Sequence, residues 1–121
     1  MIMDKDNNIQ TIDENYKITR PAIEAMIQKI VDNINPEKII LFGSWVSGAV
    51  TPDSDIDLLI ILNTHLCAAE RQRLVSRLLY PRVAPMDIVV KTPAEIQSAQ
   101  QKVDPFIHEI LRNGIVLYAR S

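Results

Sequence analysis

The chain has 121 residues, of which 47% are hydrophobic and 23% charged, and its formal net charge is -2. These values are typical of one globular domain, and the weak negative charge gives no general attraction to nucleic acid or to anionic membranes. No apolar run approaches the roughly 20 residues of a membrane-spanning helix, and the first residues lack the pattern of a signal peptide. The single cysteine, Cys67, cannot form a disulfide within the chain, which favours a reducing compartment, the cytoplasm.

The first elements are a polar arm, a helix and a buried strand. Residues 1–17 are polar and irregular, so we expect a loosely ordered arm before one domain over residues 18–121. A helix is predicted over about residues 21–34, because apolar side chains recur there at spacings of three and four after an early proline. The continuous apolar run at residues 39–42 predicts a strand buried on both faces, followed by a glycine-serine turn.

The rest of the chain alternates helical periodicity with short apolar runs. The expected elements are a short helical turn within residues 45–50, a strand entered at Asp55, a helix over 68–79, a strand over 86–90, helices over about 92–101 and from 104 to a stop at Gly114, and a strand over 115–118. This alternation predicts an α/β (or α+β) fold in which a mixed β-sheet is flanked by helices.

Polar residues that carry chemistry converge on one edge of this sheet. The long connection over residues 63–85 contains a helix, and such crossovers normally join parallel strands, so the second and third strands begin at the same end. The first connection is short and rich in turn residues, which fits an antiparallel pair and brings Gly43 and Ser44 to that end. Because side chains alternate along a strand, Asp55 and Asp57 project from one face of the sheet. Asp87 joins them if its position along its own strand also places it on that face.

Three neighbouring carboxylates repel one another unless a cation neutralises them. Mg²⁺ prefers oxygen ligands and suits a site that also holds a triphosphate, where it can activate an attacking hydroxyl. Glycine allows backbone to approach a phosphate closely, and turn N–H groups and a serine hydroxyl can bond its oxygens. We therefore interpret Asp55, Asp57 and Asp87 as catalytic, metal-binding residues, and Gly43 and Ser44 as the phosphate-binding turn of a nucleotidyl-transfer site.

At these residues the chain resembles the DNA polymerase β-like nucleotidyltransferase superfamily. The resemblance consists of Gly43-Ser44, ten intervening residues, the Asp55-Ile56-Asp57 pair and a third carboxylate at Asp87. The wider run GSWVSGAVTPDSDIDLLI is similar to the minimal nucleotidyltransferase (MNT) branch, and the similarity extends over roughly residues 20–119.

The resemblance implies a polymerase β-like fold, two Mg²⁺ ions and transfer of AMP from ATP to a hydroxyl. Asp55 and Asp57 would bind both metals, and Asp87 would act on the acceptor hydroxyl. MNT proteins of this size commonly pair with a HEPN ribonuclease toxin and act as antitoxins by adenylylating one of its tyrosines. A small chain with an open site is also expected to associate with itself or with a partner.

Two other functions stay open. The chain could neutralise a partner by contact alone, an idea favoured by Trp45-Val46-Ser47, which stands where many relatives carry a basic residue. It could instead adenylylate a small molecule such as an aminoglycoside, although a chain this short leaves no second domain to build an acceptor pocket.

Other candidate residues have a functional and a structural interpretation. For Trp45, a packed aromatic is favoured over a base-stacking one. Arginines on and after the helix over 68–79 could form a partner or nucleic-acid surface, but a solvated helix face is favoured for all of them. They are Arg71, Arg73, Arg77 and Arg82.

Overall fold

The computed structural model describes residues 2–3, 9–10, 20–49, 54–82 and 84–121. The main strands are β3 (Lys38–Phe42), β4 (Ile56–Ile61), β5 (Met86–Lys91) and β6 (Ile115–Ala119). The helices are α1 (Arg20–Ile34), α2 (Ser44–Ser47), α3 (Ala68–Leu78), α4 (Pro93–Gln101) and α5 (Pro105–Asn113). Two short strands, β1 (Ile2–Met3) and β2 (Ile9–Gln10), pair antiparallel.

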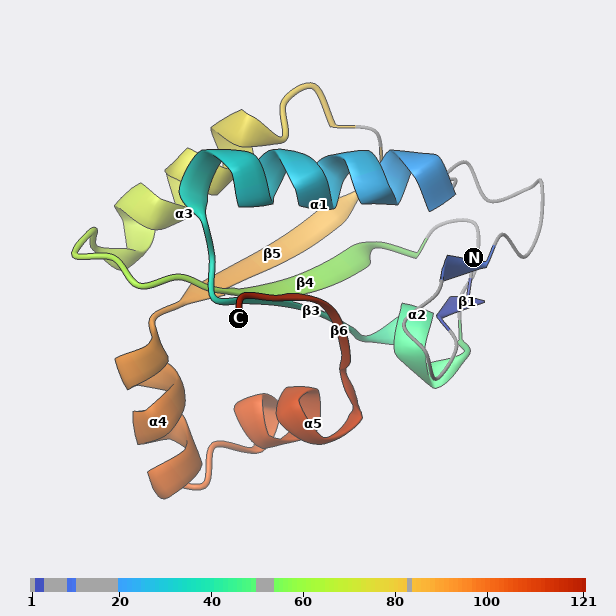
Figure 1. Cartoon of the computed structure of the whole chain (residues 1–121). Helices are drawn as coiled ribbons and strands as arrows, with labels where there is room; N and C mark the ends of the chain where they lie inside the picture. Colours follow the sequence, from blue (N-terminus) through green and yellow to red (C-terminus); the bar gives the residue numbers. More distant parts are fainter. Residues whose placement is uncertain (1, 4–8, 11–19, 50–53, 83) are drawn as a thin grey trace.

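The predicted fold class is confirmed. The four main strands form one sheet in the order β5-β4-β3-β6, in which β3 is antiparallel to both of its neighbours and β4 is parallel to β5. Helices α1 and α3 cover one face of the sheet, and α4 and α5 cover the other (Figure 1). Both strand directions inferred from the connections are therefore correct.

The predicted arm over residues 1–17 remains a prediction. Most of these residues lie outside the described part of the chain, and what is described there is the β1–β2 pair, of which β1 contacts α2.

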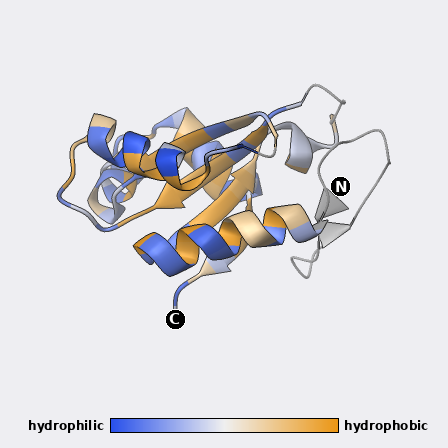
Figure 2. Cartoon of the chain, turned by 90° about the horizontal axis from the view of Figure 1, so that it is seen from above, coloured by the Kyte–Doolittle hydropathy of each residue, from blue (hydrophilic) through white to orange (hydrophobic). Residues whose placement is uncertain are grey.

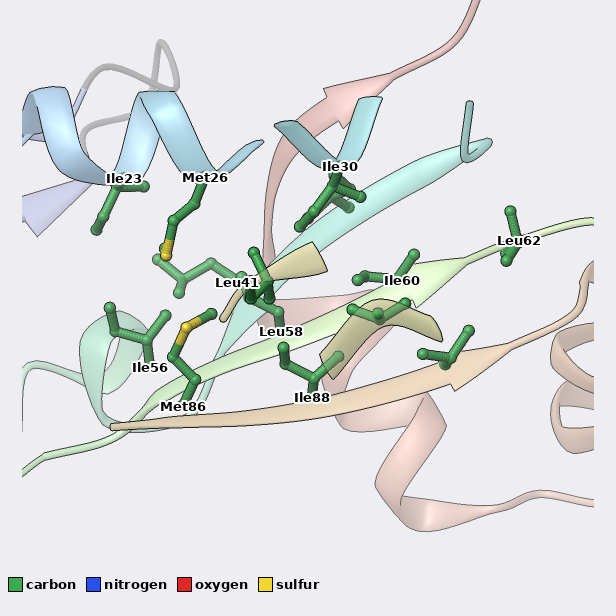
Figure 3. Close-up of a cluster of buried hydrophobic side chains, with 14 of the residues drawn as sticks. Ile23, Met26, Ile30, Leu41, Ile56, Leu58, Ile60, Leu62, Met86 and Ile88 are labelled. Atoms are coloured by element: carbon green, nitrogen blue, oxygen red, sulfur yellow. The ribbon is translucent and has the colours of Figure 1, made fainter. Parts of the chain in front are cut away.

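Two apolar layers hold the helices against the sheet, because alternate residues of the buried strands point to opposite faces. The layer under α1 and α3 contains Ile30, Leu58 and Ile60, each fully buried, and Figure 3 shows side chains of α1, β3, β4 and β5 meeting there. The layer on the other face joins Leu59 to Ile107 and other residues of α4 and α5. In Figure 2 the hydrophobic colour is concentrated on the strands, whereas the helices also carry hydrophilic residues. Truncating one such buried side chain to alanine typically costs about 2–5 kcal/mol.

Local capping explains where the last two helices begin. Thr92 precedes α4, and its side-chain oxygen accepts a hydrogen bond from the Glu95 backbone N–H at 3.2 Å. The Thr92 backbone N–H in turn donates a hydrogen bond to the Glu95 carboxylate at 2.8 Å. Asp104 precedes α5 and accepts hydrogen bonds from the backbone N–H groups of Phe106 and Ile107. Both helices predicted for this part of the chain are present.

The prediction of a solvated arginine face is wrong for Arg71. Its side chain is buried, with 5% of the residue exposed, and its guanidinium makes two hydrogen bonds to the Glu95 carboxylate, Nη1 to Oε1 at 2.7 Å and Nη2 to Oε2 at 2.9 Å. The contact joins α3 on one face of the sheet to α4 on the other. Arg73, Arg77 and Arg82 are exposed, as expected.

No helix in the described part of the chain is long and apolar enough to cross a membrane.

Candidate functional site

Three adjacent strands place the predicted carboxylates together. Phe42 at the end of β3 pairs with Asp57 near the start of β4, and Asp57 pairs in turn with Asp87 near the start of β5. Residues paired directly across parallel strands project from the same face of the sheet. Asp57 and Asp87 are therefore neighbours on the face that carries α4 and α5, while Ile56 and Met86 are buried on the opposite face. Asp55 directly precedes β4 and is exposed.

Asp57 is partly buried and has two negatively charged neighbours. Partial burial raises the pKa of the Asp57 carboxyl above its ordinary value of 3.8, and the negative charges of Asp87 and then Asp55 raise that pKa further. Both neighbours are exposed, so Asp57 is the member of the set that the protein surrounds most. This arrangement disfavours the charged carboxylate in the protein alone, and a bound cation would relieve that cost.

Gly43 allows the backbone to pass directly against Asp57. Its φ of +77° lies in the region that favours glycine, and a Cβ built on it would collide with the Asp57 Oδ2 atom. Any side chain at position 43 would therefore displace the carboxylate. The glycine of the predicted phosphate-binding turn and the central aspartate form a single packed unit.

The short helix α2 begins at Ser44, immediately after this turn. Its backbone is closed by bonds from the Val46 and Ser47 N–H groups to the Gly43 carbonyl, and it ends at Gly48, whose φ is +86°. Ser44 is partly exposed and lies next to Gly43, so the start of α2 lies at the same edge of the sheet as the carboxylates. The predicted turn and the predicted aspartates are thus brought to one place.

The donor set suits a hard cation. Three carboxylates supply the oxygen ligands that Mg²⁺ prefers. Burial and the neighbouring negative charges raise the pKa of Asp57, and a bound cation would favour its charged form. Across the described residues, however, no three His, Cys, Asp or Glu side chains are already gathered closely enough to hold a metal ion. The three carboxylates are thus of the chemical type that Mg²⁺ takes as ligands, but the described residues do not form a gathered metal site.

A cavity of about 550 Å³ opens on the other side of the turn, between α2 and α5. Apolar groups form much of its wall, and polar groups of α5 form part of its rim; the lining includes Phe42, Gly43, Val46, Phe106, Glu109 and Asn113. The sequence interpretation did not single out this cavity. The spacing of Phe106, Glu109, Ile110 and Asn113 along one face of a helix was the signal available.

The prediction that Trp45 is a packed aromatic is confirmed. Only 6% of the residue is exposed, and it joins the apolar layer on the α1 side of the sheet. The binding and catalytic roles assigned to the glycine-serine turn and the three aspartates stay predictions, although their placement agrees with them.

The family model of the polymerase beta nucleotidyltransferases matches residues 24–121, so the chain belongs to this family. The four-stranded mixed sheet and its flanking helices are the fold of that family.

Among curated proteins, the chain is similar to spectinomycin 9-adenylyltransferases of Staphylococcus aureus, with 31% identity over 93 residues. The match covers 68% of this chain and 35% of the relative, so the chain spans about a third of the length of these proteins.

Several solved structures share the fold. A toxin–antitoxin structure with AMP-PNP aligns with a TM-score of 0.56 and 24% identity, covering 81% of this chain and 74% of that one. The MntA-HepT toxin–antitoxin structure aligns with a TM-score of 0.51 and 22% identity over 80% and 69% of the two chains. A putative nucleotidyltransferase from Sulfolobus solfataricus gives a TM-score of 0.51 and 22% identity over 85% and 91%.

Proposed function

We propose that this protein is a Mg²⁺-dependent nucleotidyltransferase that transfers AMP from ATP to a hydroxyl group. The observation that supports this most is the placement of Asp57 and Asp87 as direct neighbours on one sheet face, with Asp57 packed against Gly43. Membership of the nucleotidyltransferase family supports the same reaction class. Mg²⁺, when bound, would neutralise the carboxylates and offset the negative charge that develops on the phosphates.

Each residue of the site has a role in this reaction. Asp55 and Asp57 would hold the metal ions, and the Gly43-Ser44 turn would bond phosphate oxygens of ATP and fix the direction of the triphosphate. Asp87 would accept the proton of the acceptor hydroxyl. The hydroxyl oxygen forms a bond to the α-phosphorus, the bond from that phosphorus to the bridging oxygen breaks, and pyrophosphate leaves with the electron pair.

We place the acceptor on a partner protein, as a tyrosine of a HEPN-type toxin, which would make this chain an antitoxin. The resemblance to the MNT branch and the fold shared with MntA of the MntA-HepT structure support this assignment. We place the reaction in the cytoplasm, where ATP is available and the exposed thiol of Cys67 stays reduced.

A second acceptor class is a small molecule that carries a hydroxyl. The similarity to the spectinomycin 9-adenylyltransferases favours it, since those proteins are named for transfer to an antibiotic. The donor half of the site would be the same in both cases, so only the acceptor distinguishes the two candidates.

The decisive experiment supplies Mg²⁺ and ATP labelled either at the α- or at the γ-phosphate, together with the product of a neighbouring toxin gene or with spectinomycin. AMP transfer predicts that the α-label, and not the γ-label, reaches the acceptor. The Asp57→Asn variant should lose the transfer, and the exposed Arg73→Met variant should keep it.

The acceptor that becomes labelled separates the two candidates, and mass spectrometry locates the modified residue on a protein. Neutralisation of the toxin without label transfer, retained when Asp55 and Asp57 are both changed to alanine, would instead establish an antitoxin that acts by contact.

A further inference from the structure

The cavity between α2 and α5 has no role in the phosphate chemistry described so far. It shares one wall with the site, because Gly43 both faces Asp57 and lines the cavity. A nucleotide is one molecule, so when its phosphates lie on the Gly43-Ser44 turn, its ribose and base must extend from that turn into adjoining space. The cavity of about 550 Å³ lies within the usual size range of small-molecule sites.

The lining of the cavity combines an aromatic surface with a polar rim. Phe106 is 47% exposed although it is a large apolar residue, and its ring meets that of Phe42 edge-on, with centroids 5.6 Å apart and an interplanar angle of 87°. This contact fixes the Phe106 ring from one side and leaves much of it open to the cavity. An ordered, exposed aromatic ring is a surface on which a base can stack.

The polar rim is preordered as well. The Asn113 side-chain amide donates a hydrogen bond to the Glu109 Oε1 atom at 2.8 Å, which holds both side chains on the face of α5 that lines the cavity. A carboxylate is an acceptor only, so this rim suits a base that carries an exocyclic amino group, as adenine does.

We infer that this cavity is the nucleobase subsite of the enzyme, in which the base of the nucleotide stacks on Phe106. The inference rests on the proposed function, since it assumes that the phosphates bind at Gly43-Ser44. The competing occupant is an apolar side chain of a partner protein, but such a side chain would make no polar contact with Glu109 and Asn113.

Calorimetric titration with two probes tests the inference: Mg-ATP, which has a base, and Mg-tripolyphosphate, which has none. The Phe106→Ala variant should bind Mg-ATP about tenfold more weakly, because stacking of one base on an aromatic ring contributes about 1–3 kcal/mol. Its affinity for Mg-tripolyphosphate should not change. Phe106→Trp should retain native affinity for Mg-ATP, and Tyr80→Ala, which removes an exposed aromatic outside the cavity, should behave as the native protein.

Phe106→Leu provides a second test, because leucine still packs on Phe42 but offers no ring; it too should lose ATP affinity selectively. Unchanged ATP binding in both variants, or an equal loss for both probes, would overturn the base subsite and leave the proposed reaction intact. A native protein that binds neither probe would overturn the proposed function and the base subsite together.

Discussion

The charged side chains near the two ends of strand β5 have opposite kinds of neighbour. Near its start, Asp87 lies beside Asp57, and the pKa of Asp57 is raised, first by partial burial and then by the negative charge of Asp87. Just beyond its end, the carboxylate of Glu95 receives two hydrogen bonds from the buried guanidinium of Arg71, and these bonds chiefly lower the pKa of Glu95. The Arg71–Glu95 pair at the second end stabilises the fold without any ligand. At the first end, the charged form of Asp57 is disfavoured until a cation binds. This difference supports our proposal that the functional site lies at the first end.

The largest expected effect comes from neutralising the functional end. Asp57→Asn keeps the size of the side chain but removes the charge that would hold Mg²⁺, so AMP transfer should fall by about 10³-fold or more, equivalent to several kcal/mol of activation free energy. Initial rates with α-labelled ATP measure this. Glu95→Gln, at the other end of β5, should transfer at close to the native rate. Equal losses of AMP transfer in the two variants would contradict the assignment of function to one end of β5 and of stability to the other.

A smaller loss is expected when the turn is pushed away from the carboxylate. Gly43→Ala strains a backbone with φ of +77° and drives a methyl group into Asp57, so transfer should fall by about 10²-fold and unfolding should become easier by about 1–3 kcal/mol.

Gly48→Ala is the matched control for that variant. Its φ is +86°, but among the described residues a Cβ there meets no atom within 4 Å, so the variant should share the backbone strain without the loss of transfer. Equal activity losses in the two variants would show that strain in α2, and not the contact with Asp57, matters.

Breaking the structural end should affect stability and leave transfer unchanged. Arg71→Met keeps apolar bulk in the buried position but removes both hydrogen bonds to Glu95, and we expect a loss of about 2 kcal/mol in the free energy of unfolding. Urea denaturation measures the loss, and the exposed Arg73→Met on the same helix should change stability by less than about 0.5 kcal/mol. A native stability for Arg71→Met would show that the pair contributes nothing net.

The smallest expected effects are on how stability depends on pH, and they have opposite signs for Asp57 and Glu95. The folded pKa of Asp57 is raised, so its ionisation costs stability as the pH rises above 3.8 and through the raised value. The folded pKa of Glu95 is lowered, so its contribution is present above 4.5 and is lost as the pH falls through the lowered value.

In chelator-treated samples near pH 7, Asp57→Asn should therefore be more stable than the native protein and Glu95→Gln less stable, each by about 1 kcal/mol or less. Both differences should shrink towards about pH 3. Urea denaturation across this range measures them, and a difference of the same sign for both variants would contradict the comparison.

Much of the fold was readable from local signals in the sequence. Apolar residues at spacings of three and four predicted α1, and continuous apolar runs predicted β3 and β4. The helices predicted from about residue 92 and from residue 104 correspond to α4 and α5. These signals act between residues a few positions apart, so they do not depend on what the segment later packs against. The strand directions followed from the lengths of the connections.

The placement of the residues predicted for the candidate site followed from signals that are also local. The glycine-serine turn and the alternating Asp55 and Asp57 lie on short segments whose geometry is set by turn and strand rules. The sequence required one further condition, matching parity for Asp87, and its pairing with Asp57 meets that condition.

Three features were decided only by tertiary structure. Arg71 and Glu95 lie 24 positions apart and meet because α3 and α4, from opposite faces of the sheet, both reach the end of β5. Phe42 and Phe106 likewise form one cavity wall from two distant elements. The contact between Gly43 and Asp57 depends on the antiparallel register of β3 and β4. The sequence by itself determined the elements and the chemistry they carry, since periodicity and capping act over a few residues. Which distant side chains touch was decided by packing, because burial rewards any arrangement that fills the core and local pattern does not select among them.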